Sequence, residues 1–175
     1  MTERPCWHIP VRLDDVPETG LHLALLANDE VRASLAAFVG LRDLSRLEAV
    51  IDVVREGRGL RATGRVRATA GQNCVVTLEP VESEIDEAFD VRFVPAASAG
   101  TVDVGDADAF GRAGEANESP EAMVDGTADV GAVATEFLLL GIDPYPRKPG
   151  AVFDRPSEGT VGDGPFAALA KLRNQ

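Results

Sequence analysis

Hydrophobic and polar residues alternate over several segments of the first 95 positions, a pattern typical of strands with one buried face. Short apolar runs at Trp7 to Val11 and at Leu21 to Leu26 predict two strands, separated by a turn-like acidic segment. Leu44 to Arg55 is rich in β-branched residues, and Glu56 to Gly59 has the length of a tight hairpin connection. In the returning segment, Leu60 to Thr69, apolar or small residues occupy the even positions, and Arg or Thr the odd ones. We therefore predict a long antiparallel hairpin.

Two further strands are predicted after this hairpin, which makes the middle of the chain a meander. Cys74, Val76 and Leu78 predict a strand that ends at Pro80. The next strand carries apolar residues on one face, at Ile85, Phe89, Val91 and Phe93.

Three helices are also predicted. Asn28 is a favourable N-cap for the first, acidic residues follow it in the first turn, and Gly40 is a favourable C-cap. Val130 to Leu140 has a dense apolar side and predicts a second, short helix. Pro165 to Leu172 predicts a terminal helix, because proline is well suited to the first helical position.

Residues 96–125 differ from the rest of the chain in composition. They are rich in Gly, Ala and Ser and carry seven acidic side chains against the single basic Arg112. Such a segment buries too little apolar surface to offset its ordering entropy, so we predict a flexible acidic loop. Residues 1–95 and 126–175 then form the two parts of a single domain. The expected fold class is α+β: an antiparallel sheet or partly open β-barrel with a helix in its N-terminal half and a docked C-terminal tail.

Charge and cysteine content narrow the functional class. The chain has 17 basic and 29 acidic residues, a net charge of −12, and it contains no apolar run long enough to cross a bilayer. Its start lacks the basic and apolar regions of a signal peptide, so we expect a soluble cytoplasmic protein. The Cys and His residues fit no zinc finger or ribbon by their spacing, although the Cys6-x-His8 pair could contribute to a site; they are Cys6, His8, His22 and Cys74. We predict no metal and no cofactor.

Motifs that signal catalysis are missing from the sequence. It contains no G-x-S-x-G elbow, no P-loop, no H-E-x-x-H and no Gly-rich dinucleotide turn. We therefore predict that the protein is not an enzyme and has no catalytic residues.

A basic stripe contrasts with the acidic chain. Its members are Arg55, Arg58, Arg61, Arg65 and Arg67. One interpretation is that one face of a strand offers guanidinium groups to phosphate or to an RNA backbone. The other is that the stripe pairs across the sheet with an acidic block, formed by Glu79, Glu82, Glu84, Asp86, Glu87 and Asp90.

The segment Asp143 to Gly150 contains three prolines and should run extended. It presents one aromatic residue, Tyr145, and two adjacent cations, Arg147 and Lys148. A stiff segment loses little entropy when it docks, which suits binding to a groove or to RNA, but it would serve equally well as a rigid spacer. The candidate partner-binding residues are Tyr145, Arg147, Lys148, Arg61, Arg65 and Arg67.

Several sequence elements follow one another in a fixed order. They are Cys74 to Val81, Phe89-x-Val91-x-Phe93-x-Pro95, the acidic loop, Pro120 to Gly126 leading through Asp129-Val130-Gly131 and Glu136, Asp143 to Gly150, and Pro165 to Leu172. In this order they resemble the YceD-like family of large ribosomal RNA subunit accumulation proteins. The resemblance covers most of the chain, from the helix at Asn28 to the end.

The resemblance implies a role in accumulation of the large-subunit ribosomal RNA, and hence in large-subunit assembly, in bacteria and plastids. Family genes commonly lie beside the gene of a small basic large-subunit ribosomal protein, which suggests a protein partner as well as rRNA. The resemblance supplies no catalytic residues. Many members have a Cys-x-x-Cys pair where this chain has Cys74 followed by Thr77, so a metal or redox role of that pair is in doubt here.

The leading hypothesis is a non-enzymatic factor that binds a ribosomal protein, rRNA or both in a large-subunit precursor, with no membrane contact. The alternatives are an rRNA-processing or modifying enzyme and a protein-interaction module without RNA contact.

Overall fold

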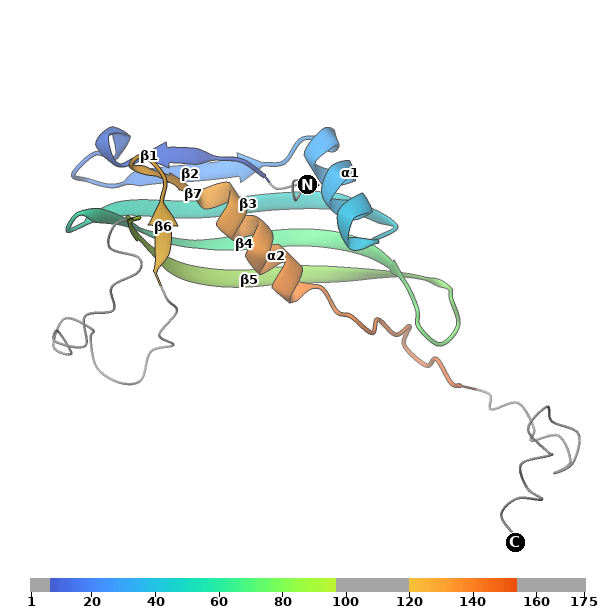
Figure 1. Ribbon diagram of the computed structural model, residues 1–175. Helices are drawn as coiled ribbons and strands as arrows, with labels where there is room; N and C mark the ends of the chain where they lie inside the picture. The colour runs from blue at the N-terminus through green and yellow to red at the C-terminus, as the bar shows by residue number, and fades with distance from the viewer. Residues whose placement is uncertain (1–6, 97–119, 154–175) are drawn as a thin grey trace, which may run out of the picture.

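Three long antiparallel strands form the centre of the computed structural model, which describes residues 7–96 and 120–153 (Figure 1). They are β3 (Asp43–Glu56), β4 (Gly59–Asn73) and β5 (Pro80–Pro95). The shorter β2 (Leu21–Leu26) and β6 (Glu121–Met123) complete a five-stranded sheet of order β2-β3-β4-β5-β6. β6 pairs with β5 in parallel, and the other pairings are antiparallel. The sheet is open, so the fold is α+β and not a closed barrel.

The inner face of this sheet carries the core. Side chains at the odd positions of β3 from Leu47 to Val53 and at the even positions of β4 point inward, as the alternation predicts, and Leu47, Ile51 and Val66 are fully buried there. Gly64 lies between Ile51 and Phe89, where a Cβ would come within 2.7 Å of the Phe89 ring. The lack of a Cβ at this position lets Phe89 pack against the sheet.

Two helices and a small second sheet cover the inner face (Figure 1). α1 (Asp29–Val39) packs on β3, and α2 (Val130–Gly141) crosses β4 and β5. The second sheet pairs β1 (Pro10–Arg12) with β7 (Thr127–Asp129), and the 3-10 turn η1 (Leu13–Asp15) leads from β1 toward β2. The opposite, outer face of the large sheet is exposed.

Local capping explains why both helices begin where the sequence predicts. The Asn28 side chain accepts a hydrogen bond from Val31 N–H, and Gly40 ends α1 in the left-handed conformation with a φ of 72°. Asp129 caps α2 in the same way by accepting from Ala132 N–H. The predicted helices after Asn28 and from Val130 to Leu140 are confirmed, as are the hairpin and the strand at Leu21–Leu26.

The predicted strand through Cys74, Val76 and Leu78 is wrong. β4 continues to Asn73, and residues 74–79 form a turn in which Leu78 N–H donates to Cys74 C=O. Leu78 takes a φ of 61°, which ends any strand at this point. The alternating apolar residues therefore belong to the connection between β4 and β5.

Other predicted boundaries also need correction. The first strand is shorter than predicted, because only Pro10–Arg12 pairs with a neighbour. Part of the predicted 96–125 loop is ordered, since β6 occupies Glu121–Met123 and continues the sheet beside the end of β5. Residues 97–119 of that loop, the predicted helix from Pro165 to Leu172, and Cys6 lie outside the described residues.

Candidate functional site: the outer face of the sheet

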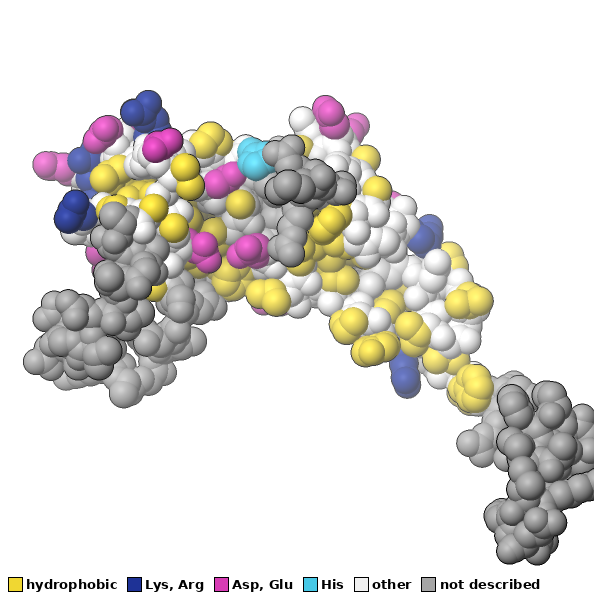
Figure 2. Space-filling view, in the orientation of Figure 1, with side chains coloured by type: hydrophobic (Ala, Val, Ile, Leu, Met, Phe, Trp, Pro, Cys, Tyr) yellow, Lys and Arg dark blue, Asp and Glu magenta, His cyan; other side chains and the backbone are white. Residues whose placement is uncertain are grey.

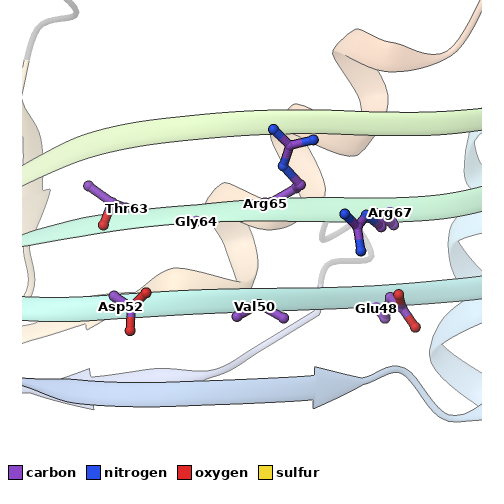
Figure 3. A pocket seen from close by; sticks show the side chains of 7 residues that line it. All are labelled: Glu48, Val50, Asp52, Thr63, Gly64, Arg65 and Arg67. Atoms are coloured by element: carbon purple, nitrogen blue, oxygen red, sulfur yellow. The ribbon is translucent and has the colours of Figure 1, made fainter.

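An open groove of about 400 Å³ runs along the outer face between β3 and β4 (Figure 3). β3 contributes Glu48, Val50 and Asp52, and β4 contributes Thr63, Gly64, Arg65 and Arg67. The hairpin register places Val50 opposite Arg65 and Glu48 opposite Arg67. Alternation alone therefore gathers the even-numbered residues of β3 and the odd-numbered residues of β4 on the face that the helices leave open.

The arginine stripe lies on this face and pairs with the neighbouring strand. Arg65 Nη1 lies 2.9 Å from Asp86 Oδ1, and Arg67 Nε lies 3.4 Å from Asp86 Oδ2. Arg61 binds both carboxylate oxygens of Asp90, and this hydrogen bonding lowers the pKa of Asp90 below its ordinary value. The predicted cross-strand pairing is thus confirmed for these three arginines. Two arginines share one carboxylate at Asp86.

Arg55 does not belong to the stripe. Its guanidinium donates to the backbone carbonyls of Val16 and Asp14 and so anchors the segment that precedes β2. Glu79 also departs from the predicted pairing, because it binds Lys148 and not an arginine of β4. Arg58, also predicted in the stripe, lies in the turn between β3 and β4. The stripe on the outer face therefore consists of Arg61, Arg65 and Arg67.

The carboxylates of the groove are also engaged. Asp52 lies 2.7 Å from His22 Nδ1 on β2. Glu48 pairs with Arg46, and hydrogen bonding to Glu48 raises the pKa of Arg46. Exposed ion pairs therefore surround the groove, and Val50 lies between them with about half of its surface exposed. Sequence reasoning missed the β3 residues of this groove.

The Pro-rich segment lies elsewhere, against the turn between β4 and β5. Pro146 C=O accepts from Val75 N–H, and Lys148 Nζ lies 3.1 Å from Glu79 Oε2. This pairing lowers the pKa of Glu79. Tyr145 and Arg147 are exposed. The segment follows α2, which covers the inner face, so the structure does not bring it together with the stripe.

Cys74 contacts this docked segment through its thiol sulfur. Its buried Sγ accepts from Lys148 N–H at 3.4 Å and from Thr77 N–H at 3.5 Å. The hydrogen bond from Lys148 N–H, supported by those from Thr77, lowers the pKa of Cys74 to about 7. The end of α2 and the segment after it carry large exposed hydrophobic residues, namely Leu140, Tyr145, Val152 and Phe153. Figure 2 shows hydrophobic side chains gathered along this C-terminal part of the described chain.

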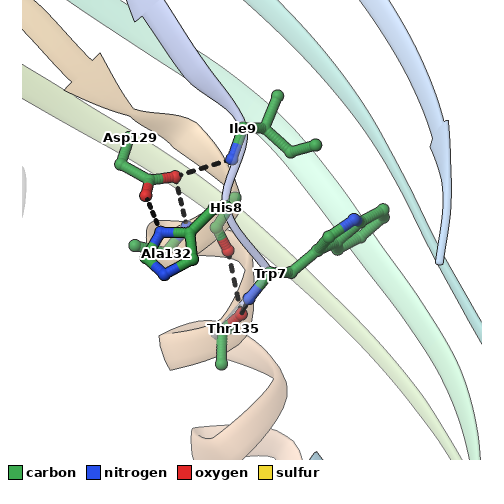
Figure 4. A network of polar contacts seen from close by, with 7 residues as sticks. Trp7, His8, Ile9, Asp129, Ala132 and Thr135 are labelled. Atoms are coloured by element: carbon green, nitrogen blue, oxygen red, sulfur yellow. Dashed lines mark hydrogen bonds and ion pairs between the residues drawn. The ribbon is translucent and has the colours of Figure 1, made fainter. Parts of the chain in front are cut away.

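A polar network ties the N-terminal segment to α2 (Figure 4). Asp129 Oδ1 accepts from Ile9 N–H at 2.9 Å and from Ala132 N–H at 3.0 Å, and its Oδ2 lies 2.7 Å from His8 Nδ1. Burial alone would raise the pKa of Asp129, but these hydrogen bonds outweigh it and lower the pKa. Trp7 N–H donates to the Thr135 hydroxyl. This network positions secondary structure and does not line the groove.

Neither a metal-binding cluster nor a membrane-spanning helix occurs in the described part of the chain. Within 7–96 and 120–153, no group of three or more Cys, His, Asp or Glu residues could hold a metal ion. No helix in the same residues is both long enough and apolar enough to span a bilayer.

Comparison with known proteins identifies the family. The model of a family described as large ribosomal RNA subunit accumulation protein YceD matches residues 62–173. The match covers most of β4, all of β5 to α2, and the Pro-rich segment. No curated protein and no solved structure matches the chain significantly. Because the matched residues are more than half of the 175, the chain belongs to the YceD family of large ribosomal RNA subunit accumulation proteins.

Proposed function

We propose that the protein is a non-enzymatic cytoplasmic factor that supports accumulation of large-subunit rRNA by binding a precursor of the large ribosomal subunit. Family membership supports the link to the large subunit. The outer-face groove, with its arginine stripe, is the surface that we assign to an rRNA contact.

The observation that carries this assignment is the shared carboxylate at Asp86. Each guanidinium has five N–H donors, while Asp86 receives one hydrogen bond from Arg65 and one from Arg67. Arg65 and Arg67 share this single carboxylate, and the two carboxylates that line the groove, Glu48 and Asp52, pair with Arg46 and His22 instead. An anionic partner could bind the spare donors without breaking either ion pair.

The shape of the groove favours a phosphate backbone over a base. The groove is open, and Arg65 and Arg67 are about half exposed. Among the described residues, no aromatic side chain lines it, so this part of the chain offers no platform on which a base could stack. Contacts of guanidinium groups to phosphates position a protein on RNA without reading sequence.

Tyr145, Arg147 and Lys148 form a second candidate contact. Arg147 and Tyr145 are exposed on a segment that is already docked, so binding through them would cost little ordering entropy. Lys148 is engaged with Glu79 and would contribute less. A small basic ribosomal protein is the protein partner that the acidic character of the chain would attract.

Complementation of a deletion strain tests the rRNA contact. The double variant R65Q/R67Q removes the two groove arginines, and R92Q is the matched control because Arg92 lies on the outer face outside the groove, paired with Glu56. We expect R92Q to restore the ratio of large-subunit to small-subunit rRNA. R65Q/R67Q should restore it incompletely, although the purified variant melts near the wild-type temperature.

Salt dependence of binding to purified large-subunit precursors distinguishes RNA from protein contacts. Each phosphate contact that is removed should flatten the log–log salt slope by about 0.7–0.9. If R65Q/R67Q complements fully and binds with an unchanged slope, the groove is not the rRNA contact. If the bound precursor rRNA is cleaved or modified by the purified protein, the non-enzymatic proposal is wrong.

A further inference from the structure

The edge of the large sheet along β5 is only partly covered. β6 pairs with Phe93 to Pro95 and with no earlier residue of β5. From Pro80 to Arg92, β5 has β4 on one side, and no strand of the described residues pairs with its other side.

The hydrogen-bond register shows which backbone groups face this open side. Ala27 N–H, just after β2, donates to Leu47 C=O of β3. Arg42 N–H, just before β3, donates to Gly71 C=O of β4. In antiparallel pairs, residues alternate between facing one neighbour and facing the other. The first bond shows that the odd residues of β3 face β2, so the even residues of β3 and their odd partners in β4 face each other. The even residues of β4 therefore face β5, and the N–H and C=O groups of their partners, the odd residues of β5, point toward β4. Those of the even residues from Glu82 to Asp90 point away from it.

These outward groups form a template for another strand. Within 7–96 and 120–153, no backbone hydrogen bond from a turn or loop reaches them. The residues that carry them are exposed: Glu82, Glu84, Asp86, Ala88 and Asp90. An unpaired row of this kind can accept an extended chain by main-chain hydrogen bonding.

The side chains beside this row are acidic. No Lys or Arg occurs from Glu79 to Asp90. Asp86 and Asp90 are paired with arginines of β4, and Glu84 accepts a hydrogen bond from the Thr69 hydroxyl. No ion pair within the described part of the chain involves Glu82, Glu84 or Glu87. The open side of β5 therefore keeps an unneutralised negative charge.

We propose that the edge of β5 from Glu82 to Asp90 binds an extended, Lys- and Arg-rich segment of a partner protein as an added strand. Opposite charges on adjacent strands stabilise a sheet, and like charges destabilise it. A second copy of this chain would place acidic residues against acidic residues, and its net charge of −12 adds to the repulsion. The edge is thus selective for a basic strand.

The edge along β2, which no strand of the described residues pairs with on its outer side, lacks this selectivity. There the register turns the backbone groups of His22, Ala24 and Leu26 away from β3, and none of these residues is acidic. This binding edge deepens the proposed function, because it names the chemistry of a protein partner. It rests on the proposed function only for where that partner comes from, a precursor of the large ribosomal subunit. It can fail while rRNA binding at the groove stands.

A synthetic peptide tests the proposal without any ribosomal component. The probe is an acetylated peptide of about nine residues in which Lys alternates with Val or Thr, long enough to span Glu82 to Asp90. One control peptide carries Glu in place of Lys. The other keeps the Lys residues but has a central Pro, so that it retains the charge and cannot continue a strand.

Two proline variants of the full chain separate the edges. Ala88→Pro removes an outward N–H from β5, and Ala24→Pro is the matched change on β2; neither N–H takes part in the existing ladder. We expect Ala88→Pro to weaken binding of the Lys peptide at least about tenfold, a difference of about 1.4 kcal/mol. Ala24→Pro should bind like the wild type.

Amide exchange in the wild-type protein supplies a measurement that needs no variant. Saturation with the Lys peptide should slow exchange of the N–H groups of Glu84, Asp86 and Ala88, whereas those of β2 should be unchanged. Equal binding of the Pro peptide would show attraction by charge alone and overturn the proposal. Unchanged exchange on β5, or loss of binding in Ala24→Pro with binding retained in Ala88→Pro, would also overturn it.

Discussion

Replacement of Asp129 by alanine should separate the N-terminal segment from α2. The carboxylate receives the Ile9 N–H and the Ala132 N–H and pairs with His8, so one side chain joins three groups from two parts of the chain. Alanine has no acceptor. The cap of α2 and the anchor of the segment before β1 would be lost together.

The expected cost follows from these contacts. Loss of an N-cap side chain costs about 1 kcal/mol. Leaving the partly buried Ile9 N–H without its acceptor costs about 1–3 kcal/mol more, whereas the exposed pair with His8 adds little. We expect Asp129→Ala to lower the free energy of unfolding by about 2–4 kcal/mol. Asp129→Asn, which keeps an acceptor and caps helices well, should lose less.

Asp52→Ala is the matched control. Asp52 also lies 2.7 Å from a histidine, His22, but it is exposed and accepts no backbone N–H in the described structure. Its loss should cost at most about 1 kcal/mol. Urea denaturation followed by circular dichroism measures both variants. Equal destabilisation by Asp129→Ala and Asp52→Ala would refute the reasoning, because it would leave no role for the backbone hydrogen bonds.

The same side chain predicts a pH dependence. The pKa of Asp129 is lower in the folded protein than its ordinary value of 3.8, so its ionised form stabilises the fold. This contribution is fully present above pH 3.8 and is lost as the pH falls through the folded pKa. The stability difference between the wild type and Asp129→Asn should therefore narrow in strong acid.

Three further outcomes are expected. Gly131→Ala would place a Cβ 1.9 Å from the Trp7 carbonyl oxygen; it should cost about 1–3 kcal/mol in urea denaturation and expose Trp7, seen as a red shift of the fluorescence of this single tryptophan. The melting temperature of the wild type should exceed that of Cys74→Ser, and the difference should grow from pH 6 to pH 9. The reason is that the pKa of the Cys74 thiol is lowered from 9.0 to about 7, so that its ionised form stabilises the fold. This stability is fully present above pH 9 and is lost as the pH falls through 7. Arg147→Gln should leave the melting temperature unchanged, whereas Lys148→Gln should lower it by at most about 4 °C through loss of an exposed ion pair.

Elements fixed by local contacts could be predicted from the sequence. The limits of α1 follow from the Asn28 side chain and the left-handed Gly40, both within the helix ends themselves. The hairpin of β3 and β4 follows from a tight turn, and the turn also sets the register that pairs Val50 with Arg65. The arginine stripe and its acidic partners were therefore accessible from alternation alone.

Elements fixed by distant contacts could not be predicted in this way. The turn at residues 74–79 has the apolar alternation of a strand, but Cys74 Sγ accepts from Lys148 N–H, a residue 74 positions away. Likewise, His8 meets Asp129 across 121 positions. The groove was missed for a simpler reason: its β3 side could have been inferred by continuing the register from the stripe onto Glu48 and Asp52.

The stripe and the β5 edge are coupled through Asp86, and this coupling predicts opposite effects of one variant. In the wild type, Arg65 and Arg67 neutralise a carboxylate that lies on the outer face beside the open edge. R65Q/R67Q removes both positive charges, so it should weaken an rRNA contact and at the same time make the edge more negative. Binding of the Lys peptide should then strengthen by about two- to fivefold at low salt, as expected from the loss of exposed ion pairs. Isothermal titration with the peptide and with precursor rRNA measures both effects on one protein. Parallel weakening of both ligands would show that they share one surface, in contradiction to the two sites argued from the register.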